Sequence, residues 1–211
     1  MKEEQKDFSE EITARQLGVE EIIFLHAAPM QAIPERTERE VVLLTWVVTG
    51  SWGVRDRFNN GATIFPGDLL RVTAGTGISI TECNPSETDP ARIVQLRLRP
   101  TQGGMISGYE VRNFFPEEME PEPLLIASVS PQGNVVNACA AVDLHAVIVG
   151  PAAAHQLQPL PSQRLIIPVE KGVIVDGNTI EGTATLDAGK GLLLESQQQR
   201  SVVLIISKAQ K

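Results

Sequence analysis

Residues 66–78 read PGDLLRVTAGTGI, a short apolar run between two turn sequences. Pro-Gly-Asp before the run and Gly-Thr-Gly after it are typical of tight turns, because proline fixes φ and glycine adopts positive φ at little steric cost. The run from Leu69 to Thr73 is too short for a helix, so we expect a strand. A second strand is expected directly after the Gly-Thr-Gly turn, over 78–82.

The same succession of short strands and turns extends outward from this stretch. Upstream, an apolar β-branched run at 41–48 is followed by residues 52–58 and then by Asn59-Asn60-Gly61, in which Asn-Gly indicates a hairpin turn. Beyond residue 124 a second series of strands has a similar rhythm, with another hairpin expected at Asp176-Gly177. Regularly spaced short strands are typical of an all-β sandwich or barrel. We interpret the shared rhythm as a weak internal repeat.

The length of the chain and the positions of its Pro- and Gly-rich segments predict how it divides into domains. Its 211 residues are enough for two small domains, each with its own core. The first segment is expected to be an arm or one short helix that begins near Ser9 and stops at Gly18. The expected segments are this arm at 1–20, a first domain at 21–100, a connector rich in Pro, Gly and Glu at 101–123, and a second domain at 124–211.

Charge and hydropathy narrow the functional classes. The chain has 26 acidic and 18 basic residues, a formal net charge of -8. An acidic surface repels phosphate backbones and anionic membranes, so we expect neither direct nucleic-acid binding nor membrane attachment. There is no apolar run of about 18 residues and no apolar signal core near residue 1. Together with Cys83 and Cys139, which are suited to being free thiols, these features predict a cytoplasmic protein.

Residues 66–78 and several segments around them resemble the pirin family. The resemblance to the family's first cupin domain is strongest over residues 41–90. The matching segments are 45–50 (TWVVTG), Arg55-Asp56, 66–69 (PGDL), 73–78 (TAGTGI), 84–88 (NPSET) and 124–128 (LLIAS). The resemblance covers most of residues 21–205. It implies an all-β fold of two tandem cupin barrels, the architecture also called a double-stranded β-helix or jelly roll.

The resemblance also implies a metal site, and this chain lacks most of its ligands. Pirin proteins bind one metal ion, usually iron, through three histidines and one glutamate. In an ungapped alignment two of the histidine positions fall on Arg36 and Glu38. The other two ligands follow the Gly-x-Gly-Ile turn, where this chain has Ile80 and Glu82. Only the glutamate is retained.

These substitutions lead us to expect no metal cofactor. Residues i and i+2 of a strand face the same side, so 36 with 38 and 80 with 82 can converge inside a barrel. Arginine does not lose its proton to ligate a metal, and its charge repels a cation. We therefore expect Arg36 to form an ion pair with Glu82 or Glu38. Weakly bound iron is the alternative.

Two of these interpretations have alternatives. Residues 35–40 could be a solvated, charged strand entry, since the inward placement of Arg36 rests on an alignment in which Pro34 and Arg39 match the family. Cys83 is either a small apolar residue of the core or a redox-responsive thiol near the pocket.

The histidines of this chain do not restore the site. His26 lies some ten residues before the ligand segment. His145 is expected in a strand of the second domain, and His155 in an exposed loop.

For the pirin family the resemblance implies quercetin 2,3-dioxygenase activity and roles as regulatory partners of other proteins. Dioxygenase chemistry requires a metal that binds and activates the substrate. We therefore expect a non-catalytic binding or regulatory protein, whose partner is another protein or a small molecule in the first barrel. One alternative is a quercetin 2,3-dioxygenase-like oxygenase with an unusual metal site. Another is a metal-independent acid/base enzyme that uses Glu38 and Glu82.

Overall fold

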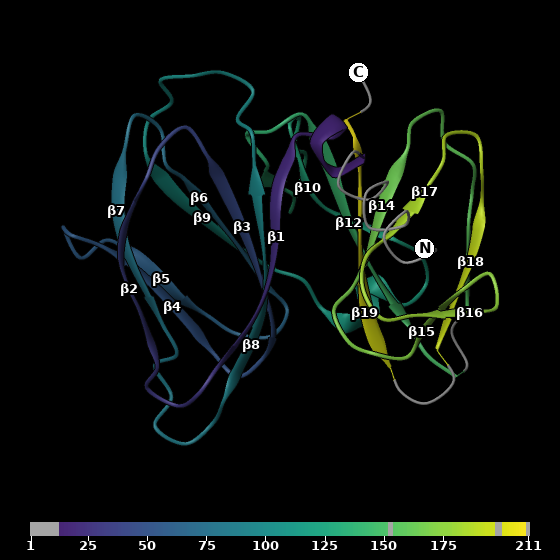
Figure 1. The fold of residues 1–211 in the computed structure, drawn as a ribbon, viewed down its shortest axis with the longest axis horizontal. Helices are drawn as coiled ribbons and strands as arrows, with labels where there is room; N and C mark the ends of the chain where they lie inside the picture. The colour runs from purple at the N-terminus through teal and green to yellow at the C-terminus, as the bar shows by residue number, and fades with distance from the viewer. Residues whose placement is uncertain (1–12, 152–153, 197–199, 210–211) are drawn as a thin grey trace, which may run out of the picture. The chain divides into compact units, whose positions relative to one another are not determined.

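The computed structural model describes residues 13–151, 154–196 and 200–209, and most of their regular structure is β-strand (Figure 1). The chain divides into two compact units. We call residues 19–114 with 128–141 the N-terminal barrel, and residues 115–127 with the described residues from 142 onward the C-terminal barrel. The expected all-β architecture of two barrels is confirmed.

The N-terminal barrel consists of two antiparallel sheets. Its strands are β1 (Val19–Ala27), β2 (Ala32–Glu38), β3 (Val42–Thr49), β4 (Trp52–Asp56), β5 (Gly61–Ile64), β6 (Asp68–Thr73), β7 (Ile78–Cys83), β8 (Ala91–Leu98) and β9 (Gly108–Asn113), with β11 (Val136–Asn137) in the returning segment. One sheet has the order β1-β8-β3-β6-β9, and the other has the order β2-β7-β4-β5. β1 and β2 are therefore both edge strands.

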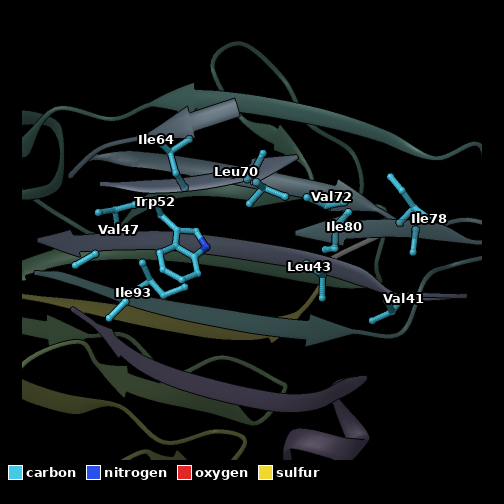
Figure 2. Close-up of a cluster of buried hydrophobic side chains, with 14 residues drawn as sticks. Val41, Leu43, Val47, Trp52, Ile64, Leu70, Val72, Ile78, Ile80 and Ile93 are labelled. Atoms are coloured by element: carbon cyan, nitrogen blue, oxygen red, sulfur yellow. The ribbon is translucent and has the colours of Figure 1, made fainter. Parts of the chain in front are cut away.

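The core of the N-terminal barrel lies between these sheets and follows from the alternation of side chains along each strand. Leu43 and Val47 of β3 face the interior, as do Trp52 and Val54 of β4. Figure 2 shows the Trp52 indole among aliphatic side chains that include Ile93. Since Trp52 is fully buried, this one side chain contributes several kcal/mol, on the order of 3–5 by the cost of truncating such a residue.

Residues 66–78 carry the chain from one sheet to the other. Asp68 starts β6 and accepts a hydrogen bond from the backbone N–H of Phe65 at 2.8 Å, which closes the Pro-Gly-Asp turn. After β6, Gly75 and Gly77 take φ values of +54° and +151° and lead into β7 of the opposite sheet. These two glycines therefore place the start of β7.

The first expected hairpin forms with a longer loop than Asn-Gly alone would give. β4 and β5 are paired, but the residues with positive φ are Asn59 and Gly61. The carboxylate of Asp56 accepts hydrogen bonds from the backbone N–H groups of Phe58 and Asn60 at 2.9 and 2.8 Å. This side chain stabilises a wider loop at the expense of a two-residue turn.

The C-terminal barrel has a second pair of sheets. Its strands are β10 (Leu124–Ser128), β12 (Val142–Val149), β13 (His155–Leu157), β14 (Arg164–Pro168), β15 (Val173–Val175), β16 (Asn178–Ile180), β17 (Ala184–Leu186), β18 (Leu192–Ser196) and β19 (Ser201–Lys208). Among these strands, the order in the first sheet is β10-β12-β19-β14-β17, and the second sheet has the order β13-β18-β15-β16. The expected hairpin at Asp176-Gly177 is confirmed, with both residues at positive φ between β15 and β16.

The connector expected at 101–123 contains structure that its composition concealed. β9 lies within it and pairs with β6, so this part of the chain completes a sheet of the N-terminal barrel. Residues 128–141, expected in the second domain, belong to the N-terminal barrel as well. Flanking Pro and Gly residues obscured a six-residue strand, and strand pairing over long sequence separations leaves little local signal.

In the part of the chain that the structure describes, helical structure is limited to short segments. Residues 13–16 are helical, and the turn that follows stops at Gly18, whose φ is +80°, as expected. The start expected near Ser9 lies outside the described residues. A second helix, α2 (Pro116–Met119), was not expected. Within the described ranges, neither segment is long and apolar enough to cross a membrane.

The turn between β6 and β7 supplies a test of the fold. Gly75→Ala should lower the free energy of unfolding by about 2–5 kcal/mol, because a Cβ atom there combines positive φ with a clash against the carbonyl oxygen of Met105. Gly104→Ala is the matched control, since Gly104 also has positive φ but no atom within 4 Å of an added Cβ. It should cost only about 1 kcal/mol. Urea unfolding followed by circular dichroism measures the free energy of unfolding of both variants. Equal losses in the two variants would contradict the close backbone approach at Gly75.

Candidate functional site

A bulge in β2 determines which of its side chains face the interior of the N-terminal barrel. Ile33 pairs with Glu82 of β7 and Arg36 pairs with Ile80, so three steps along β2 match two along β7. Pro34 lies at this irregularity, on an edge strand, where a missing N–H costs little. As a result Ile33 and Arg36 both line the interior pocket, although they are three residues apart.

The guanidinium of Arg36 bridges two buried carboxylates. Its Nε donates to Oε1 of Glu38 at 2.7 Å, and its Nη2 donates to Oε2 of Glu82. Glu38 is 5% exposed and Glu82 is 1% exposed. Within 35–38, Glu35 and Thr37 are exposed whereas Arg36 and Glu38 face inward; residues 39 and 40, beyond the end of β2, are also exposed.

Glu82 is held by further donors from two other strands. Trp52 Nε1 donates to Glu82 Oε1 at 3.1 Å, and Gln95 Nε2 donates to the same oxygen at 2.9 Å. Gln95 Nε2 also donates to the hydroxyl of Thr45 at 3.0 Å. Every oxygen of this carboxylate therefore accepts at least one hydrogen bond, as a buried charge requires.

Arg97 of β8 is a member of the site that the sequence analysis missed. Its Nη1 and Nη2 donate to the two oxygens of Glu38 at 2.7 and 2.8 Å, a bidentate pair. Its Nε lies 3.5 Å from an oxygen of Glu21 at the rim. The alternation along β8 was overlooked. Gln95 and Arg97 alternate with apolar residues and lie on the same face of the strand as Ile93, which indicates that they face inward.

The ion pairs hold these groups in their charged forms. Hydrogen bonds from Arg97 keep the pKa of Glu38 below its ordinary value, although burial acts in the opposite direction. Burial tends to lower the pKa of Arg36, but attraction to Glu82 and hydrogen bonds to both carboxylates outweigh it, so the pKa of Arg36 is raised. Hydrogen bonding to Glu38 likewise raises the pKa of Arg97.

Ile80 has no part in this polar cluster. It is fully buried in the apolar core beside Ile78 and offers no lone pair (Figure 2). Among the described residues, no group of three or more His, Cys, Asp or Glu side chains is arranged to hold a metal ion. The side chains at the positions implied by the resemblance therefore do not fit the three-histidine, one-glutamate site of the pirin family.

Cys83 and the histidines lie apart from the cluster. Cys83 is a free, partly buried thiol next to Glu82 on β7, and strand alternation directs it to the opposite face. His26 is exposed on β1, and His145 lies on β12 as expected. The expectation of an exposed loop at His155 was wrong: this residue begins β13, is 8% exposed, and its Nε2 hydrogen-bonds the carbonyl oxygen of Ile148 at 2.8 Å.

The cluster forms the floor of a pocket of about 310 Å³ in the N-terminal barrel. Its walls come from β1, β2, β4, β7 and β8, and the rim lies at the edge strands β1 and β2. Apolar side chains line most of it: Ile23, Leu25, Ile33, Trp52 and Ile93. Volume, burial and converging polar groups make this pocket the candidate binding site.

The amino-acid sequence of this chain is similar to a known family and to known relatives. The family model described as Pirin matches residues 4–98. The quercetin 2,3-dioxygenase of Escherichia coli K12 is 25% identical over 162 residues, which are 74% of this chain and 68% of that protein.

Solved structures show the same fold. YhhW from Escherichia coli superposes with a TM-score of 0.80 at 19% identity, covering 92% of this chain and 82% of YhhW. A structure of the bacterial pirin YhhW in complex with nickel(II) gives a TM-score of 0.79 at 18% identity, covering 92% of this chain and 83% of that one. The match to the Pirin family model over residues 4–98 and the two-barrel fold shared with YhhW show that this chain is similar to pirin proteins.

Proposed function

We propose that this protein uses a guanidinium in place of the pirin metal ion and acts as a non-catalytic binding or regulatory protein. The observation that carries the proposal is the contact of Arg36 with both Glu38 and Glu82. Arg36 stands at an aligned histidine position and supplies the positive charge that a metal ion would bring to Glu82.

The chemistry of the donor set supports this proposal. Iron, copper, nickel and zinc prefer imidazole or thiolate ligands, whereas the cluster offers two carboxylates and an amide. Both carboxylates already accept hydrogen bonds from cationic side chains. A metal ion would have to displace Arg36 and leave its charge without a partner, which is costly in a buried site.

Two enzymatic alternatives are less well supported. An oxygenase like the E. coli relative, or one with weakly bound iron, would need a metal at this same cluster. Acid/base catalysis by Glu38 and Glu82 would need a carboxyl group that exchanges protons near neutral pH. The lowered pKa of Glu38 keeps it deprotonated, and Arg97 occupies both of its oxygens.

The proposal also covers the class of partner and the location of the protein. The partner is a small molecule in the pocket or another protein, and the acidic balance of the chain disfavours nucleic acid. A cytoplasmic location is proposed on the basis of the two free cysteines.

Metal content and turnover test the proposal directly. Protein purified without an affinity tag should contain far less than one equivalent of iron, nickel, copper, zinc or manganese by elemental analysis. It should not turn over quercetin in metal-supplemented buffer, with the E. coli enzyme as positive control. The variant Arg36→His/Glu38→His/Ile80→His, which restores three imidazoles beside Glu82, should take up metal. Near-stoichiometric metal in the unaltered protein would sink the proposal.

The structural role of the guanidinium is tested by a double-mutant cycle. Arg36→Ala should lower the free energy of unfolding by about 3–5 kcal/mol, because it leaves Glu82 buried and charged. Arg36→Ala/Glu82→Gln should recover part of that loss, since the remaining group is neutral. Arg55→Ala, at an exposed arginine whose side chain donates to Asn59, is the control and should change stability by about 0.5 kcal/mol or less. A loss at Arg36 no larger than at Arg55 would show that the ion pair is unimportant.

The acid limb of the stability curve should depend on Glu38. Its pKa is lower in the folded protein than in the unfolded chain, so the unfolded chain binds a proton first as the pH falls. Stability from this group is therefore complete above its ordinary pKa of 4.5 and is lost as the pH drops from there through the folded pKa. Urea unfolding between pH 7 and 3 should show a shallower acid loss for Glu38→Gln than for the unaltered protein. Parallel curves would be evidence against this coupling.

A further inference from the structure

The pocket above the cluster has a mouth between two edge strands and a surface of mixed character. β1 contributes Glu21 at its rim, with Ile23 and Leu25 below, and β2 contributes Ile33 opposite. Most of the surface that a ligand would touch is therefore aliphatic. Polar groups are confined to the floor and one side of the rim, so orientation depends on few contacts.

The floor has almost no hydrogen-bonding capacity to spare. Both oxygens of Glu82 accept from Trp52, Gln95 or Arg36, and both oxygens of Glu38 accept from Arg36 or Arg97. A ligand ammonium would bring donors to acceptors that are already occupied. It would also lose its hydration on entering, and the one excess negative charge of the lining, carried by Glu21 with a 59% exposed side chain, compensates little of that cost.

One donor of Arg36 is left for a ligand. Its Nε and Nη2 are engaged with the carboxylates, and Nη2 also approaches Gln95 Oε1 at 3.4 Å. Within the part of the chain that the structure describes, Nη1 makes no hydrogen bond. Arg36 lines the pocket, 28% of its side chain is exposed, and Nη1 is not among the buried polar atoms that lack a partner, so a ligand oxygen can accept from Nη1.

The charge balance disfavours an anion. The pocket is lined by the cations Arg36 and Arg97 and by the carboxylates of Glu21, Glu38 and Glu82. The carboxylates outnumber the guanidinium groups by one. Since the excess carboxylate, Glu21, is exposed at the rim and the buried charges cancel, an anionic ligand would lose its hydration without a net positive charge to compensate it.

We propose that this pocket binds a small uncharged ligand of one or two rings that carries a carbonyl or hydroxyl oxygen. The apolar body packs against Ile23, Leu25, Ile33 and Ile93, and the oxygen accepts a hydrogen bond from Arg36 Nη1. The assignment rests on the proposed function, because a metal ion at the cluster would remove the guanidinium that the ligand contacts. It deepens that function by naming the ligand class.

The indole of Trp52 provides the readout. The chain has two tryptophans, Trp46 and Trp52, so a ¹⁵N-labelled sample gives two indole N–H resonances, and Trp46→Phe assigns them. Titration with acetophenone should shift the Trp52 resonance, which belongs to the group that donates to Glu82, in a saturable manner. Toluene, which lacks the acceptor, should bind up to about tenfold more weakly. Benzoate and benzylammonium, which are charged, should each bind at least about tenfold more weakly than acetophenone.

Variants locate the effect. Ile33→Phe fills the pocket and should abolish the acetophenone shift, whereas Ile106→Phe, at a side chain that is 92% exposed, should leave it unchanged. The unaltered protein with the four probes carries the test should Ile33→Phe fail to fold. Absence of a saturable shift with acetophenone overturns the inference, as does benzoate or benzylammonium binding equally well.

Elemental analysis of the same samples separates the two proposals. Metal-free protein that does not bind acetophenone refutes the ligand class and leaves the metal-free function standing. Metal in the unaltered protein refutes the proposed function. Binding that survives treatment with a chelator supports both.

Discussion

Glu82 is a carboxylate with 1% of its surface exposed, and the surrounding structure provides what such a group needs. A buried charge of this kind destabilises the fold unless cations and donors surround it. Arg36 supplies the charge, and Trp52 and Gln95 supply further hydrogen bonds from other strands. Since these donors come from both sheets of the N-terminal barrel, the carboxylate also couples the sheets through polar contacts that cross the apolar core.

Features encoded in neighbouring residues were predictable from the sequence. The turns around 66–78 and at Asp176-Gly177 depend on glycine and proline within a few positions, and the structure contains them. Positions 36, 38, 80 and 82 were found through resemblance to a family, and alternation along a strand predicted that Arg36 and Glu38 share a face. Local patterns of this kind indicate where a side chain points. They do not indicate what it meets across the barrel.

What was missed depends on long-range pairing or on a single side-chain contact. Arg97 reaches Glu38 across 59 positions of sequence. The alternation along β8 indicates that Arg97 faces inward, but nothing near either residue indicates which side chain it contacts. β9 escaped notice because six residues among Gly, Pro and Glu have little strand character until β6 pairs with them. His155 is buried because the carbonyl of Ile148 satisfies its ring nitrogen. In each case a partner distant along the chain, or in an adjoining strand, overrides local composition.

Because of the bulge in β2, the two ends of that strand differ in how well they tolerate the deletion of one residue. Ile33 and Arg36 both face inward only because one extra residue lies between them. Loss of that residue would straighten the ladder and leave Arg36 in place, since the pairing on either side is already in phase. Loss of a residue between Arg36 and Glu38 would instead direct one of the two outward. A one-residue deletion near Pro34 is therefore compatible with an intact pocket, whereas a deletion between Arg36 and Glu38 is not.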